Sequence, residues 1–390
     1  MNILLDFIPL QHDGGFGGAF SYTKAVYDEV CLRSSSNNKL FAAYNSSLPI
    51  GKQYNYQEYA QQHNIQLLDL TTSTLSQHIT KHNINTFFIA MGQFYVNYPL
   101  DGINCKVIMG IHDIWDVERV NNQIEYVIKD RLAENNWQWA KRMYNVISGR
   151  FNRQQQAIYN HIIPLYSAPK TFSFTVSEYT RDALLYYFPQ LSGKEIHIYY
   201  SPARSINMQP EIENKVLRTI IAEEKTYLLM LAANRRFKNA QTLMKVFKRL
   251  QADFPNLYLI TTRYGHSIHP QHVDIPFLSD SDLEHAYQHA HALVFGSFFE
   301  GFGYPPIEAM RHGTPCVASN VTSIPEILGD AGIYFSPFYS ADMYRAIKEV
   351  LNDRNCRQKQ IAHRFAEVSQ RQKDDLKKLV DEIFNINYII

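Results

Sequence analysis

The sequence has few cysteines, no long apolar run and no excess of either charge. Its four cysteines lie far apart among 390 residues and form no Cys-x-x-Cys pair, which excludes a zinc ribbon and argues against a disulfide framework. No stretch reaches the roughly 18 apolar residues of a membrane span. The 38 basic and 37 acidic side chains leave a net charge of +1, which argues against a dedicated nucleic-acid-binding protein.

We expect no secretory signal, because an apolar run follows Met1 without preceding basic residues. No internal repeat or low-complexity tract is present. We therefore expect a cytoplasmic protein. With 45% hydrophobic residues over this length, the chain can form two domains with buried cores.

Short apolar segments alternate with helix-period segments in two series, as in doubly wound α/β domains. The first series predicts strands at 3–7, 40–44, 86–90, 107–111, 172–176 and 196–200. The second predicts strands at 227–232, 257–261, 292–295, 316–319 and 333–335, with helices at 240–254, 282–291, 306–312 and 341–351.

The two series meet at 201–214, a stretch with two prolines and little periodicity. We therefore expect an N-terminal domain at 1–203 and a C-terminal domain at 204–371. An amphipathic helix follows in the tail, at 373–385 of a segment spanning 372–390. Residues 117–165 contain no convincing strand and predict a helical insertion rich in aromatic and basic residues.

The most informative segment, at 298–310, reads Phe-Phe-Glu-Gly-Phe-Gly-Tyr-Pro-Pro-Ile-Glu-Ala-Met. Its prolines suit a first helical turn, its glycines allow close backbone approach, and a helix amino terminus attracts phosphate. Glu300 and Glu308 can both face a cleft at the carboxyl ends of strands, where a carboxylate can hold both hydroxyls of a ribose. Alternatively, Glu308 is a first-turn residue that interacts with the helix dipole, and Glu300 lies in solvent.

A basic cluster, Asn-Arg-Arg-Phe-Lys-Asn at 234–239, lies at the first strand-to-helix crossover of the second series. Cations at the carboxyl end of a strand suit a diphosphate. We therefore treat Arg235 and Lys238 as candidate phosphate-binding residues. The alternative is a solvated basic loop.

Two further patterns follow strands of the first series. The loop at 13–18 has four glycines in five residues, a composition that permits close approach to a phosphate or sugar. No Gly-Lys-Ser/Thr follows it, which excludes a P-loop kinase or ATPase. His112 and Asp113 follow the strand at 107–111, either as site residues or as a hydrogen-bonded histidine beside a helix-capping aspartate.

Two patterns resemble metal sites but have simpler explanations. Asp-Ser-Asp at 280–282 precedes a helical segment and predicts an N-cap. His266, His269 and His272 lie in a predicted Pro-containing loop without a fourth ligand in register. We expect no metal site.

Together these residues resemble the retaining glycosyltransferases of family 4, with greatest specificity between 227 and 350. Glu300 and Glu308 match that family's pair of glutamates separated by seven residues, and Arg235 and Lys238 match its phosphate-binding pair. Further segments in the family's expected places are 14–18, 112–113, 177–178 and 315–326.

The resemblance implies an α/β protein with the GT-B fold. Two doubly wound Rossmann-like domains would face each other across a cleft, and the C-terminal helix would cross back to the first domain. It also implies transfer of a hexose-type sugar from a nucleotide-sugar donor to a glycan, lipid-linked or other glycoconjugate acceptor, as in polysaccharide biosynthesis. The reaction would retain the anomeric configuration and require neither a metal nor another cofactor, and nucleic acid is not an expected partner.

The resemblance also implies roles for individual residues. Arg235 and Lys238 would neutralise the phosphates, Glu300 would hold donor-sugar hydroxyls, and His112 would contact the donor sugar from the first domain; these four are the predicted catalytic residues. Glu308 would hold the ribose. The remaining predicted donor-binding residues are Gly15, Phe16, Gly17, Gly301, Phe302, Gly303 and Tyr304.

Three alternatives remain open at this stage. The same fold could carry a sugar-nucleotide epimerase or a phosphorylase, or serve as a non-catalytic nucleotide-sugar-binding subunit of a glycosylation complex.

The insertion at 117–165 is a candidate for acceptor contact or for peripheral contact with the inner face of the membrane. We prefer a packed helical hairpin with a solvated basic face there, so the insertion supplies no predicted site residue.

Overall fold

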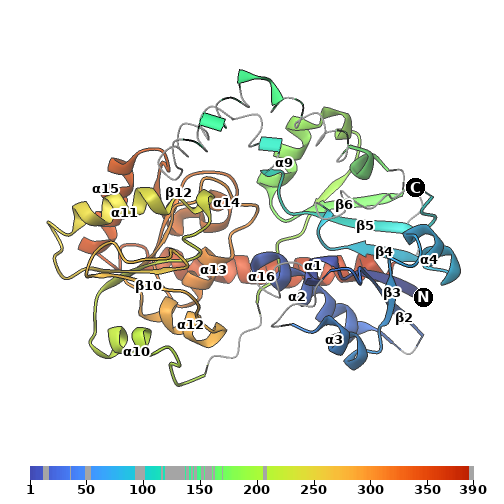
Figure 1. Ribbon diagram of the computed structural model, residues 1–390, viewed down its shortest axis with the longest axis horizontal. Coiled ribbons are helices and arrows are strands. Elements are labelled where there is room, and N and C mark those ends of the chain that lie inside the picture. Colours follow the sequence, from blue (N-terminus) through green and yellow to red (C-terminus); the bar gives the residue numbers. More distant parts are fainter. Residues whose placement is uncertain are drawn as a thin grey trace. The chain divides into compact units, whose positions relative to one another are not determined.

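The computed structural model describes residues 1–11, 17–35, 37–48, 54–92, 102–115, 117–118, 163–168, 170–204 and 209–385, with scattered positions between 137 and 160. The chain divides into two compact units (Figure 1). The first comprises 1–121, 150–204 and 371–390, and the second comprises 122–149 and 205–370. Most of the predicted insertion at 117–165 lies outside the described residues, as do Gly15 and Phe16.

The first unit contains a parallel sheet with the strand order β3-β2-β1-β4-β5-β6-β7. The sequence predicted each of these strands except β3, which has a single buried residue and therefore little apolar signal. The strands are β1 (Asn2–Asp6), β2 (Lys39–Tyr44), β3 (Gln66–Asp69), β4 (Thr86–Ile89), β5 (Lys106–Ile111), β6 (Thr171–Thr175) and β7 (Ile196–Ile198).

Helices pack against this sheet, and the buried side chains of one layer form a continuous apolar cluster that includes Phe87, Met109 and Leu184. Several of these helices begin at a side-chain cap, for example Ser177, whose Oγ accepts the N–H of Thr180. The described helices are α1 (Ile8–Gln11), α2 (Gly17–Arg33), α3 (Tyr56–Gln62), α4 (Leu75–Lys81) and α9 (Glu178–Tyr187), with a 3-10 turn at Pro189–Leu191.

The second unit contains a parallel sheet with the strand order β10-β9-β8-β11-β12-β13. One expectation was wrong here: His272 does not lie in a loop but begins β10, where its side chain is buried and hydrogen-bonded to Thr261. The strands are β8 (Tyr227–Met230), β9 (Tyr258–Thr262), β10 (His272–Ile275), β11 (Ala292–Phe295), β12 (Cys316–Ser319) and β13 (Gly332–Phe335).

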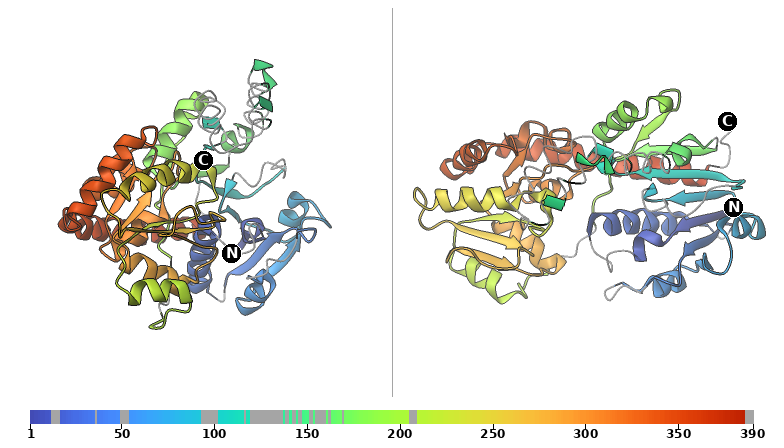
Figure 2. Two further views of the ribbon diagram at one scale, coloured as in Figure 1. Left: turned by 60° about the vertical axis from the view of Figure 1, so that its left-hand side comes forward. Right: turned by 45° about the horizontal axis from the view of Figure 1, so that its top comes forward.

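Helices cover both faces of this second sheet. In Figure 1, α11 and α15 lie together on one face, and α10 and α12 lie on the other; Figure 2 shows the same layers from two other directions. The sequence did not predict α10. The helices are α10 (Lys215–Ala222), α11 (Ala240–Leu250), α12 (Asp280–His289), α13 (Tyr304–Arg311), α14 (Ile324–Leu328) and α15 (Ser340–Asn352), with 3-10 turns at Arg236–Lys238 and Gly329–Ala331.

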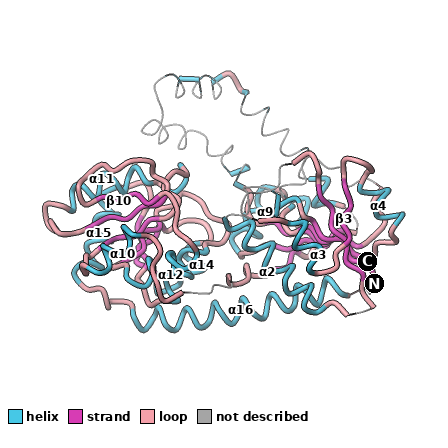
Figure 3. Tube along the Cα trace, turned by 60° about the horizontal axis from the view of Figure 1, so that its bottom comes forward, coloured by secondary structure: helices cyan, strands magenta, loops and turns pink. Residues whose placement is uncertain are grey.

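The C-terminal helix α16 (Gln358–Phe384) begins well before the predicted start at 373 and is unbroken (Figure 3). Its residues from 371 onward belong to the first unit. There the ammonium group of Lys106 donates to the carbonyl oxygen of Glu382 at 3.0 Å and to that of Asn385 at 3.1 Å. Among the described residues, no helix combines the length and apolar character needed to cross a membrane.

Candidate functional site

In the second unit, the direction in which successive strands are added to the parallel sheet changes between β8 and β11. Successive connections lead from β8 toward β10 on one side and from β11 toward β13 on the other. Such a switch point is where open α/β sheets bind ligands, beyond the carboxyl ends of the strands. The loop after β8 contains the basic cluster, and the loop after β11 contains Glu300. A backbone hydrogen bond of 2.7 Å, from the N–H of Phe298 to the carbonyl of Phe237, joins the two loops.

The structure brings two predicted catalytic residues, Lys238 and Glu300, into direct contact. The Lys238 ammonium donates to Oε1 of Glu300 at 2.6 Å, and the side chains are only 10% and 14% exposed. The ring of Phe295 lies beneath the ammonium group at 4.4 Å from its centroid. The alternatives for these residues were a solvated basic loop and a Glu300 side chain in solvent. Both are wrong for Lys238 and Glu300, because neither side chain lies in open solvent.

Hydroxyl groups that the sequence analysis did not single out hold the Glu300 loop. Ser297 Oγ donates to Oε1 of Glu300 at 2.6 Å, and the N–H of Glu300 donates to Oγ1 of Thr322 at 3.1 Å. Ser323 Oγ lies 3.0 Å from the carbonyl oxygen of Glu300 and 3.1 Å from that of Phe302. The resemblance at 315–326 was the one available signal for Thr322 and Ser323.

The helix α13 begins as the motif predicts. Gly303 precedes it with φ of +109°, a conformation that favours glycine, and prolines occupy its first turn. Glu308 lies one turn further in and is not a first-turn residue, so the helix-dipole alternative is wrong. Its side chain is buried, and the hydroxyl of Tyr287 on α12 donates to its Oε2 at 2.7 Å. Sequence reasoning had no signal for Tyr287.

Arg235 has a different environment from Lys238. Its side chain is exposed and lines a pocket of about 330 Å³ that Lys238, Glu300 and Glu308 do not line. No described carboxylate forms an ion pair with it. The basic loop thus presents one buried cation to Glu300, and two exposed arginines, Arg235 and Arg236, line this pocket.

In the first unit, His112 follows β5 as predicted and is 9% exposed. Its Nε2 lies 3.0 Å from the carbonyl oxygen of Ala90, and the ring meets that of Tyr22 edge-on. Burial lowers the pKa of His112 to about 4, and the hydrogen bond to Ala90 opposes that effect. The imidazole is therefore neutral near pH 7, with Nε2 as donor and Nδ1 as an acceptor.

Two neighbouring residues of the first unit also lie at helix starts. Asp113 accepts the N–H of Trp115 at 3.1 Å, which is the capping role considered above. Gly17, the described member of the predicted donor loop, begins α2 with φ of +88°.

The two patterns that resembled metal sites have structural roles. The residues at 280–282 do not precede α12 but form its first turn, and the cap is Ser279. The buried carboxylate of Asp282 accepts the N–H groups of Glu213 and Asn214 at 2.8 and 3.0 Å. Over the described ranges, no three His, Cys, Asp or Glu side chains converge in a way that could hold a metal ion.

The Lys238–Glu300 pair has unused hydrogen-bonding capacity. Within the described part of the chain, the ammonium group of Lys238, which has three N–H bonds, donates to Glu300 alone. Both Lys238 and Ser297 donate to Oε1 of Glu300, and no described residue donates to Oε2. The pair can therefore offer N–H groups to an anion and a carboxylate oxygen to a hydroxyl group at adjacent positions.

Part of the chain is similar to a known protein family. Residues 264–367 match the family model of glycosyl transferases group 1. The chain is 30% identical over 159 residues to the serotype-specific mannosyltransferase WbdA of Escherichia coli, which covers 36% of this chain and 19% of that protein. It is 29% identical over 187 residues to the O-antigen chain mannosyltransferase RfbU of Salmonella typhimurium. That match covers 45% of this chain and 50% of RfbU. The chain thus spans half or less of the length of these relatives.

The likeness to solved structures extends over the whole chain. The structure of HepE from Anabaena in complex with UDP-glucose is 14% identical, has a TM-score of 0.63 and covers 98% of both chains. At this identity the likeness concerns the fold alone. The chain therefore has the GT-B fold, and its residues 264–367 are similar to the glycosyl transferases of group 1.

Proposed function

We propose that this protein is a retaining glycosyltransferase that transfers mannose from a nucleotide-activated donor to a growing cell-surface polysaccharide, without a metal ion. The contact between Lys238 and Glu300 at the switch point carries this proposal. The family match, which includes Glu300 and Glu308, supports glycosyl transfer. The choice of mannose and of a polysaccharide acceptor follows the names of the relatives.

The proposed chemistry follows from the charges at this site. Breaking the bond between the sugar and the diphosphate releases negative charge on the leaving group. Lys238 would stabilise that charge from a site with little solvent, together with Arg235 on the same loop and the backbone amides of 301–304. Glu300 would accept hydrogen bonds from donor-sugar hydroxyls, and Glu308 would hold the ribose. In the first unit, we assign the neutral His112 to accept a hydrogen bond from a sugar hydroxyl.

A panel of nucleotide sugars tests the function directly. Purified protein is incubated with GDP-mannose, UDP-glucose and related donors and an α-mannoside acceptor, in the presence of excess EDTA. We expect transfer from a mannose donor, with NMR showing the donor's α configuration in the product. An inverted product, or activity that returns only with Mn²⁺ or Mg²⁺, would contradict the retaining or the metal-independent part. Recovery of an epimerised nucleotide sugar, or phosphate-dependent cleavage, would favour the epimerase or phosphorylase instead.

Replacement of the buried cation tests the proposed role of Lys238. Lys238→Ala should lower kcat by about 100- to 1,000-fold, the usual effect of removing one donor that stabilises a developing negative charge. Lys245→Ala is the matched control, because Lys245 is an exposed lysine of α11. An equal kcat for the parent and Lys238→Ala would refute the assignment.

A further inference from the structure

A second pocket of the second unit lies at the end of the sheet opposite the candidate site. It has a volume of about 230 Å³ and is lined by the ends of α10 and α12, the segments that lead into β8 and β11, and Arg354, which follows α15. These segments precede strands of the parallel sheet, whereas Lys238 and Glu300 follow strands. The proposed donor chemistry therefore does not account for this pocket.

Arg354 gives the pocket a permanent positive charge. One of its N–H groups donates to the carbonyl oxygen of Ala290 at 3.2 Å, and no carboxylate among the described residues forms an ion pair with it. A guanidinium has five N–H groups, so most of those of Arg354 remain available to a ligand. Lys225, the other permanent cation of the wall, is less available, because it lies 3.5 Å from Glu223 in an exposed ion pair.

Two histidines line the same pocket, His289 at the end of α12 and His291 just before β11. Nε2 of His291 lies 3.0 Å from the carbonyl oxygen of Val350, so this nitrogen carries the hydrogen and Nδ1 of the neutral ring has none. Burial lowers the pKa of both imidazoles, and the positive charge of Arg354 lowers the pKa of each further. Both rings are therefore mostly neutral near pH 7, and each can gain a proton when an anion binds beside it.

Other charged and titratable groups face these histidines from the neighbouring elements. The pKa of His289 is also lowered by His285, one turn back on α12, and by His312, which follows α13. Glu284 lies 2.6 Å from His312 and does not line the pocket. Among the described residues, Glu224 is the one acid of the wall. Permanent cations and protonatable rings thus outnumber carboxylates in the pocket.

This set of groups suits an oxyanion. No three His, Cys, Asp or Glu side chains of the described residues are placed to hold a metal ion. The volume lies below the roughly 300–1,000 Å³ of pockets that enclose a drug-sized ligand. A guanidinium and two imidazoles on separate elements can instead donate N–H groups to a small anion whose oxygens point in several directions.

We propose that this pocket is a second anion-binding site of the protein, which takes a phosphate group. Arg354 would pair with two of its oxygens, and the protonated rings of His289 and His291 would bind the others. Because the anion favours the charged imidazoles, binding would take up protons and become tighter as the pH falls from 8 to 6. The phosphate is either inorganic phosphate or a monoester group of a larger molecule that extends out of the pocket.

NMR titration of the whole chain, with ¹⁵N-labelled histidines, tests the proposal. Sulfate is the first probe, because it resembles phosphate and keeps its charge between pH 6 and pH 8. At constant ionic strength, we expect sulfate to shift the ring signals of His289 and His291 saturably and to bind at least about threefold more tightly at pH 6 than at pH 8. The variants His289→Asn and His291→Asn assign the two signals. No saturable shift, or equal affinity at the two pH values, overturns the proposal.

Two further probes identify the source of the phosphate group. Inorganic phosphate and glycerol 3-phosphate are titrated at pH 6 with the same two ring signals as the readout. Tighter binding of inorganic phosphate identifies the free anion, and tighter binding of glycerol 3-phosphate identifies a monoester. Binding of sulfate without binding of either phosphate compound contradicts the proposal.

Single replacements locate the binding site. Arg354→Gln keeps an amide donor for the carbonyl oxygen of Ala290 but loses the charge, and it should weaken sulfate binding by about tenfold, the effect of losing a hydrogen bond to a charged group. Glu224→Gln removes the acid from the wall and should tighten binding by about threefold. Arg218→Gln and Glu211→Gln, at exposed positions outside the pocket, are the matched controls and should leave the affinity unchanged.

Lys238→Ala separates this pocket from the candidate donor site. The variant should leave the sulfate-induced shifts of His289 and His291 unchanged. Loss of those shifts in Lys238→Ala, or unchanged affinity in Arg354→Gln, refutes a second anion site. Because no sugar transfer is measured, failure of the proposed mannosyl transfer would not alter these results.

Discussion

At the residue scale, the site depends on charges that are nearly removed from water. A buried ammonium and a buried carboxylate are stable only when they compensate each other and find further hydrogen bonds. Lys238 and Glu300 do so, with Ser297 and the ring of Phe295 completing their surroundings. The two side chains are already held in position by these contacts. A ligand that binds them therefore meets groups whose orientation is fixed in advance.

The hydroxyl of Tyr287 should orient Glu308 for nucleotide binding. Tyr287→Phe removes the hydrogen bond to Oε2 of Glu308, and we expect KM for the donor to rise about fivefold with kcat nearly unchanged, the effect of losing about 1 kcal/mol of uniform binding. The measurement is steady-state kinetics.

Tyr227→Phe is the matched control for that replacement. It also removes a buried hydroxyl, which donates to the carbonyl oxygen of Ala286 at 2.7 Å, but it does not touch Glu308. Equal changes in KM for both variants would mean that the hydroxyl of Tyr287 has a structural role alone.

His112 should make the stability of the protein depend on pH. Its pKa of about 4 in the folded state lies below the usual value near 6.5, so the unfolded chain binds a proton first as the pH falls. The free energy of unfolding should therefore decrease between pH 6.5 and 4, by about 3 kcal/mol from this group. Urea unfolding of the parent and of His112→Asn at pH 7 and pH 4.5 measures the difference.

Comparison with His112→Asn shows whether His112 itself causes the loss of stability at low pH. His112→Asn should lose less stability than the parent over this pH range, because the other buried histidines are present in both proteins. Parallel losses in the two proteins would show that His112 titrates normally.

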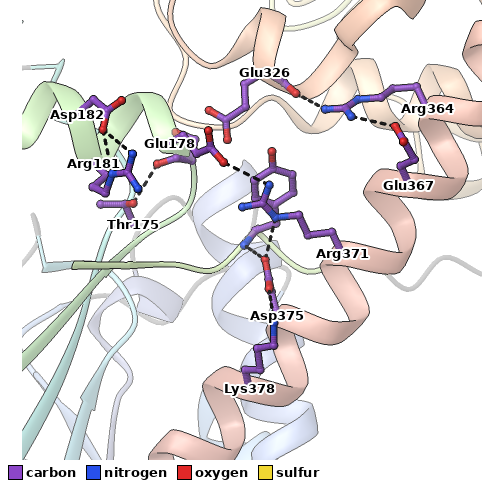
Figure 4. A network of polar contacts seen from close by, with 12 residues as sticks. Thr175, Glu178, Arg181, Asp182, Glu326, Arg364, Glu367, Arg371, Asp375 and Lys378 are labelled. Atoms are coloured by element: carbon purple, nitrogen blue, oxygen red, sulfur yellow. Dashed lines mark hydrogen bonds and ion pairs between the residues drawn. The ribbon is translucent and has the colours of Figure 1, made fainter. Parts of the chain in front are cut away.

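At the element scale, the second half of α16 is fixed to the first unit by buried polar contacts. The carboxylate of Asp375, which is almost fully buried, accepts the N–H of Tyr200 at 3.0 Å and lies 3.4 Å from Nε of Arg371 (Figure 4). The guanidinium of Arg371 lies 3.6 Å from Glu178 and 3.7 Å from the centroid of the Tyr200 ring. Helix α16 is therefore part of the structure of the first unit from residue 371 onward.

Loss of the Asp375 carboxylate should destabilise the first unit. Asp375→Ala leaves the buried N–H of Tyr200 without its acceptor, and we expect the free energy of unfolding to fall by about 2–3 kcal/mol in denaturant titrations. Lys377→Ala removes a charged side chain from an exposed position of the same helix and should change stability by less than about 0.5 kcal/mol. Comparable values for the two variants would disprove the anchoring role.

The two strands that sequence analysis missed share a physical cause. β3 and β10 lie at sheet edges, where half-exposed strands carry few apolar residues, and His272 reads as a loop residue although it is buried. The central strands were predicted because both of their faces are buried and their sequences are almost wholly apolar.

At the scale of the whole molecule, the chain repeats one architecture in two units. Each unit has its own parallel sheet and its own apolar core. The second unit holds the candidate site with Lys238, Glu300 and Glu308, together with the whole segment that matches the glycosyl transferases of group 1. The likeness to solved GT-B structures covers both units.

The sequence by itself determined the two α/β series, the strand ends that carry polar residues, and the helix start after Gly303. These follow from local rules: apolar runs form buried strands, and glycine and proline restrict the backbone at turns. Only the tertiary structure decided that Lys238 pairs with Glu300, that Tyr287 holds Glu308 and that Arg235 is exposed while Lys238 is buried. Those contacts join residues 21 to 62 positions apart, and the packing of separate elements, not local sequence, sets which side chains meet.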